Sequence, residues 1–117
     1  DSNGDQFDYD VECKIVRNKR VGKKWDYCKY YVTGGVMRFF KNLYSQNLPL
    51  GAMIGYVQEG IPSDLQETIN KKSRDKNLSS MRRNGNWQIN GVTRFSQHLN
   101  RKKAKDFRLT HLWVDLR

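Results

Sequence analysis

The chain has 117 residues, with 22 Lys and Arg against 12 Asp and Glu, which gives a formal net charge of +10 at pH 7. This length suits one domain rather than two. No run of the sequence approaches the roughly 18 apolar residues of a membrane-spanning helix, and 3 Trp, 6 Tyr and 5 Phe supply core material that a disordered chain lacks. Two cysteines, Cys13 and Cys28, do not make a disulfide scaffold. We therefore expect a reducing, cytoplasmic setting.

Charge is distributed unevenly along the sequence. Residues 1–12 contain five acids and no bases, whereas the rest of the chain contains all 22 bases. A chain this basic favours a polyanionic partner, because phosphate contacts release counterions. Nucleic acid is the expected partner class. The acidic head is interpreted either as a solvated segment or as a cluster that binds metal.

The first predicted element is a strand. Residues 9–16 (YDVECKIV) alternate between polar and apolar side chains, and Val11, Cys13 and Ile15 share one face. This pattern predicts that the three apolar side chains anchor the strand in the core. Residues 17–24 (RNKRVGKK) then form a basic loop or turn.

A helix and a second strand follow in the first half of the chain. Residues 25–44 carry apolar side chains at helical spacing. The apolar stripe consists of Val32, Val36, Phe39, Phe40 and Leu43. The pair Gly34-Gly35 inside this helix indicates close packing on a strand. Residues 52–57 (AMIGYV) form a short apolar run, which predicts a strand buried on both faces.

The second half of the chain has weaker signals. A second helix is predicted with Ser63 or Asp64 as its N-cap. Residues 73–95 are rich in Asn, Ser and Arg, which predicts a long loop. Residues 107–116 (FRLTHLWVDL) alternate, which predicts a closing strand with His111 as a hydrogen-bonded core histidine or a half-buried one.

The order of these elements predicts an α/β domain. The first two strands are joined through a helix, so we expect them to be parallel with a right-handed crossover. The predicted architecture is a mixed central sheet flanked by helices, in a single domain over residues 1–117.

The candidate catalytic residues are Glu12 and Lys14, which lie on the first predicted strand. Residues two apart in a strand project from the same face, so the carboxylate and the ammonium lie together. A carboxylate can hold a hard cation such as Mg²⁺, which polarises a phosphoryl oxygen and lowers the pKa of a bound water. A neighbouring ammonium can orient that water or stabilise the charge that develops on phosphorus.

This E-x-K on an apolar strand, followed by a helix and a second strand, resembles the PD-(D/E)XK nuclease superfamily. The resemblance covers about residues 9–57, and YYVTGGVMRFF and LGAMIGYV also look like restriction endonuclease-like proteins of bacteria. It implies a restriction endonuclease-like core and a nuclease of restriction or defence type that hydrolyses phosphodiester bonds of DNA with Mg²⁺ or Mn²⁺.

The resemblance also implies roles for particular residues. Glu12 matches the second carboxylate of the motif and Lys14 its lysine. The first carboxylate of the family lies a strand earlier, so three alternatives are open: Asp1 serves as that metal ligand, a preceding segment carries it, or the chain is an inactive relative of the family. In the second case the chain is the C-terminal part of the domain, and a partner subunit or N-terminal segment completes the site.

The basic residues are expected to hold phosphates without reading the base sequence. The candidates are Arg17, Lys19, Arg20, Lys23, Lys24, Arg38, Lys41, Arg82, Arg83, Arg101, Lys102 and Lys103. Trp87, in the polar segment, is a candidate for stacking on a base.

Two other functions remain open. One is a non-catalytic basic nucleic-acid-binding domain of a larger assembly. The other is an interaction module whose basic face docks an acidic protein. Glu12 and Lys14 can also have no catalytic role and form only an exposed ion pair on an edge strand. Such a pair contributes under about 1 kcal/mol to stability.

Overall fold

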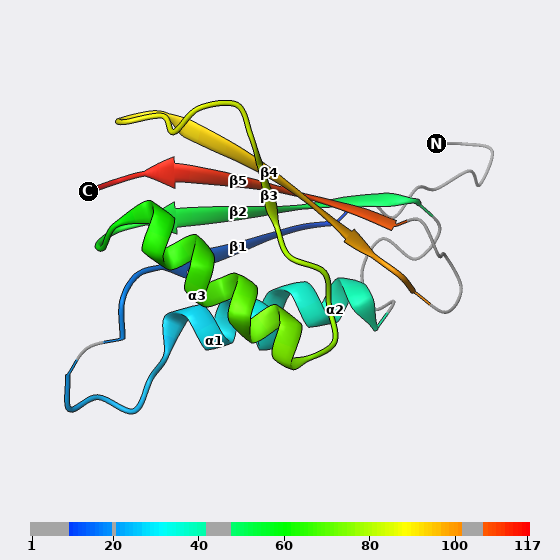
Figure 1. Cartoon of the computed structure of the whole chain (residues 1–117), viewed down its shortest axis with the longest axis horizontal. Helices are drawn as coiled ribbons and strands as arrows, with labels where there is room; N and C mark the ends of the chain where they lie inside the picture. Colours follow the sequence, from blue (N-terminus) through cyan, green and yellow to red (C-terminus); the bar gives the residue numbers. More distant parts are fainter. Residues whose placement is uncertain (1–9, 20, 42–47, 102–106) are drawn as a thin grey trace, which may run out of the picture.

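The computed structural model of the chain describes residues 10–19, 21–41, 48–101 and 107–117. Five strands form one mixed sheet in the order β1-β2-β5-β4-β3 (Figure 1). They are β1 (Val11–Val16), β2 (Leu50–Val57), β3 (Arg82–Asn84), β4 (Val92–Leu99) and β5 (Phe107–Asp115). Strands β1, β2 and β5 are parallel, whereas β4 and β3 complete the sheet with antiparallel pairings. The predicted mixed sheet and the parallel pairing of its first two strands are confirmed.

The predicted first helix consists of three consecutive short elements. They are α1 (Tyr27–Tyr31), the π-helical turn η1 (Val32–Val36) and α2 (Met37–Phe40). Asp26 caps α1 by accepting a hydrogen bond from the backbone N–H of Lys29 at 3.1 Å. The predicted apolar stripe is buried at its first three positions and half-buried at Phe40, while Leu43 lies outside the described residues. A Cβ on Gly35 would collide with the side chain of Met53, which shows how closely η1 approaches β2.

The second helix, α3 (Pro62–Asp75), differs from the prediction at both ends. Its N-cap is Ile61, which makes no capping hydrogen bond, and Pro62 occupies the first turn, where its missing N–H costs nothing. The predicted cap role of Ser63 or Asp64 is therefore wrong. The predicted loop over 73–95 is also wrong, because it contains the end of α3, all of β3 and the start of β4.

All the described helices lie on one face of the sheet (Figure 1). On β4 and β5 every second side chain is buried beneath them, whereas the alternate side chains are half-buried or exposed. The helix-facing side chains are Thr93, Phe95, Gln97, Leu99, Phe107, Leu109, His111 and Trp113. The structure is therefore a two-layer arrangement with one open face. Within the described residues, no helix is both long and apolar enough to cross a membrane.

This one-sided covering overturns the predicted orientation of β1. Val11 and Ile15 are 50% and 38% exposed, and Cys13 is exposed as well. Glu12 and Lys14 point instead toward the helices, on the same side as the fully buried Val16. Alternation separates the two faces of a strand, but it does not say which face the helices cover. For the same reason β2 is not buried on both faces, since Ile54 and Tyr56 on its open side are only half-buried.

A chain of buried hydrogen bonds joins the helix layer to the centre of the sheet. The indole N–H of Trp113 donates to the Tyr31 hydroxyl at 3.1 Å, and this hydroxyl lies 2.6 Å from Nδ1 of His111. The other ring nitrogen of His111 lies 2.9 Å from the Gln97 side-chain oxygen, and the Gln97 amide donates to the Ser79 carbonyl at 2.6 Å. Every contact has a donor and an acceptor if His111 is neutral and protonated on Nε2. The predicted hydrogen-bonded core histidine is confirmed.

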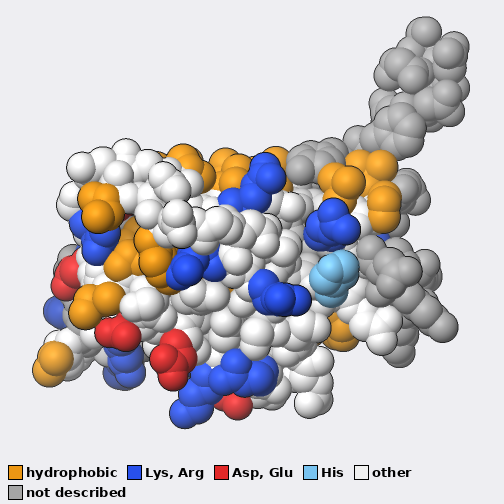
Figure 2. Space-filling model, turned by 45° about the horizontal axis from the view of Figure 1, so that its top comes forward, with side chains coloured by type: hydrophobic (Ala, Val, Ile, Leu, Met, Phe, Trp, Pro, Cys, Tyr) orange, Lys and Arg blue, Asp and Glu red, His pale blue; other side chains and the backbone are white. Residues whose placement is uncertain are grey.

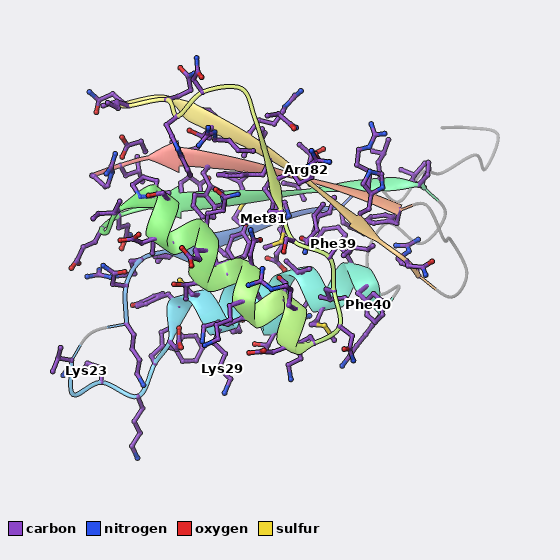
Figure 3. The ribbon with its side chains drawn as sticks, viewed as in Figure 1. Lys23, Lys29, Phe39, Phe40, Met81 and Arg82 are labelled. Atoms are coloured by element: carbon purple, nitrogen blue, oxygen red, sulfur yellow. The ribbon has the colours of Figure 1, made fainter. Side chains whose placement is uncertain are left out.

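A second buried polar contact fixes α3 to the strand that follows it. The Asn70 side chain accepts a hydrogen bond from the Met81 backbone N–H at 2.7 Å and donates one to the Met81 carbonyl at 3.1 Å. One amide therefore satisfies both backbone groups of Met81, whose side chain belongs to the core. Figure 3 labels Met81 beside Arg82, the first residue of β3.

We predict that Tyr31→Phe lowers the free energy of unfolding by about 1–3 kcal/mol, because it leaves the Trp113 N–H and the His111 Nδ1 buried without partners. Urea denaturation followed by tryptophan fluorescence measures this loss. Tyr30→Phe is the matched control, since Tyr30 is the preceding residue of α1 and is 36% exposed. Equal effects of the two substitutions would contradict the role of the buried chain.

We also predict that His111 makes stability depend on pH. Burial lowers the pKa of His111 to about 3 in the folded protein, against about 6.5 in an unfolded chain. Between these values the unfolded chain binds a proton that the folded protein does not. The free energy of unfolding therefore falls as the pH drops below about 6.5, by up to about 1.4 kcal/mol per pH unit.

The measurement is urea denaturation across this pH range for the wild type, His111→Gln and His98→Gln. The three proteins have the same carboxyl groups, so the comparison isolates the effect of one histidine. His111→Gln should have the shallower pH dependence, and His98→Gln, which changes an exposed histidine, should follow the wild type. A wild-type slope retained in His111→Gln would refute this prediction.

Candidate active site on strand β1

Glu12 and Lys14 form a half-buried ion pair on the helix-facing side of β1. The Lys14 Nζ lies 3.5 Å from a carboxylate oxygen of Glu12, and the two side chains are 13% and 21% exposed respectively. On β2, Met53 is the register partner of Glu12 and Gly55 is that of Lys14. Both residues therefore lie on a regular parallel strand. The structure thus brings together the carboxylate and the ammonium that the strand spacing predicts.

Aromatic side chains from the helix layer border this pair. The Lys14 Nζ lies 4.4 Å from the centroid of the Tyr30 ring, and Trp25 packs against that ring with 4.8 Å between centroids. The stem of Lys14 lies near Gly35 of η1, where a larger residue would restrict the space. A ring face stabilises a nearby cation, so Tyr30 and Glu12 together hold the ammonium in place.

Few carboxylates are available at this position for the predicted magnesium ion. Mg²⁺ usually binds through one or two carboxylates and keeps several waters or substrate phosphate oxygens. Glu12 supplies one carboxylate, and Asp10 precedes it by two residues. Among the described residues no group of three or more His, Cys, Asp or Glu gathers around a common point. Asp1, the predicted further ligand, lies outside the described residues.

Two of the predicted phosphate-binding residues are buried. Arg17 is 8% exposed, and its guanidinium forms an ion pair with Glu59 and donates to the Gln58 side chain at 3.3 Å. Arg101 is 1% exposed, and it donates to the Phe39 carbonyl at 3.3 Å and lies 4.0 Å from the Phe107 ring centroid. The prediction that these two arginines face a phosphate backbone is wrong, because both guanidinium groups are used inside the protein.

The other predicted phosphate-binding residues do not form one surface. Seven are exposed: Lys19, Lys23, Lys24, Arg38, Lys41, Arg82 and Arg83. Lys23 lies in the loop that follows β1 and extends away from the body of the molecule (Figure 3). Strand β3, which carries two of the arginines, is at the opposite edge of the sheet from β1. Arg20, Lys102 and Lys103 lie outside the described residues.

The sequence does not identify Tyr30 and Trp25 as residues that border the site, and the predicted base-stacking role of Trp87 does not match its packing. The clustering of aromatics in WDYCKYY was a visible signal, but nothing local shows that Tyr30 reaches Lys14. Trp87 is half-buried and packs edge-on against Phe95. The guanidinium of Arg83 covers the ring at 4.6 Å, so Trp87 is not an open platform for a base.

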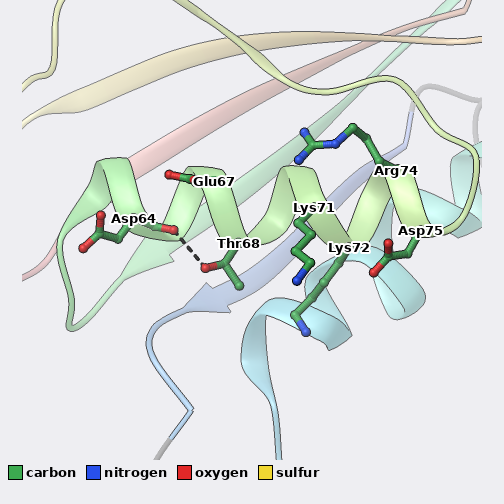
Figure 4. A pocket seen from close by; sticks show the side chains of 7 residues that line it. All are labelled: Asp64, Glu67, Thr68, Lys71, Lys72, Arg74 and Asp75. Carbon is green, nitrogen blue, oxygen red and sulfur yellow. Dashed lines mark hydrogen bonds between the residues drawn. The ribbon is translucent and has the colours of Figure 1, made fainter.

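A shallow hollow on the outer side of α3 offers a different kind of surface (Figure 4). Its lining contains three acids and three bases together with Thr68, whose hydroxyl donates to the Asp64 carbonyl at 2.9 Å. Lys72 in this lining is already paired with Asp26 at 3.1 Å. Opposite charges that alternate along an exposed helix are typical of a solvated surface, so this hollow does not favour an anion.

Comparisons with known proteins give no relative for this chain. No protein-family model matches the sequence, no curated protein matches it, and no solved structure matches the fold. The restriction endonuclease-like core therefore stays a prediction that rests on the E-x-K strand and the elements after it.

Proposed function

We propose that the protein is a metal-dependent nuclease that hydrolyses phosphodiester bonds of DNA, with Glu12 and Lys14 as its catalytic pair. The observation that carries this proposal is the placement of the two side chains. They share one side of a strand, their charged atoms are 3.5 Å apart, and each side chain is at most about one-fifth exposed. A restricted, low-dielectric setting of this kind strengthens the action of fixed charges on a reacting group.

Each residue has a distinct role in the proposed hydrolysis. Glu12, with Asp10 as the nearest further carboxylate in sequence, would hold Mg²⁺ or Mn²⁺, which supplies Lewis-acid polarisation of the phosphoryl oxygen. The Lys14 ammonium donates hydrogen bonds to the attacking water and to the oxygens that gain negative charge on phosphorus. The water oxygen forms the new bond to phosphorus and gives up a proton to solvent, while the ester oxygen leaves with the electron pair of the broken P–O bond and takes up a proton.

Positive charge on the chain supports a nucleic-acid substrate. The loop that follows β1 carries Lys19, Lys23 and Lys24, all exposed, and the chain has a net charge of +10. Exposed lysines contact phosphates without reading bases. A nuclease of restriction or defence type is the version of this activity that the E-x-K resemblance favours.

We predict that the wild type cuts supercoiled plasmid in Mg²⁺ or Mn²⁺ and is inactive in EDTA. Glu12→Gln and Lys14→Met should each reduce the cleavage rate by about a hundredfold or more. Affinity for DNA in EDTA should stay within about twofold, because each substitution removes one group from a site that acts in the transition state. Agarose gels and fluorescence anisotropy give the two readouts.

Glu67→Gln and Lys71→Met are the matched controls, since they make the same changes on exposed positions of α3. Urea denaturation verifies that all four variants fold. Activity retained in Glu12→Gln or Lys14→Met would refute the proposed site. Salt-sensitive DNA binding without metal-dependent cutting in the wild type would instead indicate the non-catalytic nucleic-acid-binding domain.

A further inference from the structure

The face of the sheet opposite the helices is largely apolar, and no described helix or strand covers it. Neighbouring strands place its apolar side chains in rows, such as Cys13 beside Ile54 and Ile54 beside Leu112. We define the apolar patch as Val11, Cys13, Ile15, Ile54, Tyr56, Leu112, Val114 and Val92. Val11, Val92 and Ile15 are 50%, 48% and 38% exposed, so this patch is in contact with water. Contiguous apolar surface of this kind marks an interaction site.

Basic side chains border the patch on the same face. We define the basic strip as Arg82 on β3, Arg94 and His98 on β4, and Arg108 on β5. Arg94 is the register partner of Leu112, and Arg108 is the register partner of both His98 and Leu50. The strip therefore adjoins the apolar patch directly. Figure 2 shows Lys and Arg side chains and a histidine on a surface bordered by hydrophobic side chains.

Among the residues that the structure describes, no carboxylate compensates the charge of the basic strip. The open face of the five described strands carries no Asp or Glu, since Glu12 and Asp115 both lie on the helix-facing side. Arg82, Arg94 and Arg108 form no ion pair with any residue in the described part of the chain. A shallow hollow lined by Arg82, Ser96 and His98 lies along the strip. An occupant of this face is thus expected to bring its own carboxylates.

We propose that this open face docks an amphipathic helix of a partner protein, apolar on one side and lined with Asp or Glu along one flank. Three adjacent strands span about 10 Å, which matches the 10–12 Å diameter of a helix with its side chains. Apolar side chains at i, i+3, i+4 and i+7 of the partner cover the apolar patch. Its acidic flank pairs with the basic strip, which sets the orientation of the helix.

Other occupants fit this face less well. Single-stranded nucleic acid binds to sheets through stacked aromatic rings, and Tyr56 is the one aromatic side chain on the open face of the described strands. A second copy of the chain would bring apolar surface, but the described strands of that copy offer no carboxylate on the same face for the arginines. The acidic amphipathic helix is the occupant that matches both the apolar patch and the basic strip.

Cys13 provides a direct reporter for docking. It is an exposed thiol within the apolar patch, and Cys28, the other cysteine of the chain, is buried with its pKa raised to about 11 by burial. Alkylation of the native protein therefore measures access to the open face, because a buried thiol of raised pKa reacts slowly.

The probe is a designed acidic amphipathic peptide of about five helical turns, with leucines at i, i+3, i+4 and i+7 and glutamates along one flank. We expect a saturating concentration of it to slow Cys13 alkylation by about tenfold. A peptide of the same composition in scrambled order should leave the rate unchanged, and so should a version with lysine in place of glutamate. Equal protection by the scrambled peptide would overturn the proposal.

Variants test the two parts of the surface separately. Arg94→Glu and Ile15→Glu should each weaken peptide binding by about tenfold, or about 1.4 kcal/mol. Lys71→Glu and Ile61→Glu, which make the same changes outside the open face, should stay within about twofold of the wild type. Losses of equal size in the control pair would contradict docking on this face.

Two further measurements identify a wrong occupant. Protection of Cys13 by single-stranded DNA instead of the peptide, lost in Arg94→Glu, would assign the face to nucleic acid. Sedimentation as a dimer that Ile15→Glu dissociates would assign it to a second copy. Either result would overturn the proposal. Plasmid cleavage should be unaffected by Arg94→Glu, so the docking proposal and the nuclease proposal fail independently of each other.

Discussion

The hydrogen bond between the Tyr31 hydroxyl and His111, 2.6 Å long, fixes the helix layer on the sheet. Tyr31 lies on α1 and His111 lies on β5, and both are fully buried. Because the bond belongs to a chain of contacts with no unpaired member, α1 has little freedom to slide over the strands. The position of the following turn, where Gly35 approaches Met53, depends on the same attachment.

The surroundings of the candidate catalytic pair depend on this attachment, because Tyr31 and Tyr30 are neighbours in the chain. Tyr31 points into the core, and the preceding residue, Tyr30, places its ring 4.4 Å from the Lys14 ammonium. Tyr31 attaches the helix to the sheet, and Tyr30 contacts the lysine. The buried chain of hydrogen bonds thus acts on the site indirectly, by keeping the aromatic border of Lys14 at a constant distance from β1.

Much of the fold follows from local patterns, and the errors have physical causes. The strand-helix-strand unit over β1, α1 and β2 was predictable because its apolar periods are strong. Strand β4 was missed because Thr93 and Gln97 occupy buried positions on it, which weakens the apolar alternation. Gln97 is tolerated there because His111 and Ser79 satisfy its amide, and neither partner is close in sequence.

Of the candidate site, the sequence predicts only that Glu12 and Lys14, two residues apart on a strand, lie side by side. Two residues apart on a strand means one shared face, so Glu12 and Lys14 meet. Which face of the strand the helices cover depends on long-range packing. This packing leaves the side chains of Val11 and Ile15 exposed. The buried Arg17 was misjudged for the same reason, since its carboxylate partner Glu59 lies 42 residues away.

The proposed function requires β1 to present a metal-binding carboxylate beside a lysine. Titration of the ¹⁵N-labelled protein with Mn²⁺, followed by paramagnetic broadening of the amide resonances, probes this requirement without a cleavage assay. Broadening should be confined to β1 and the residues next to it in the wild type, and it should disappear in Glu12→Gln. Broadening centred on the acids of α3, or an unchanged profile in Glu12→Gln, would show that this requirement is not met.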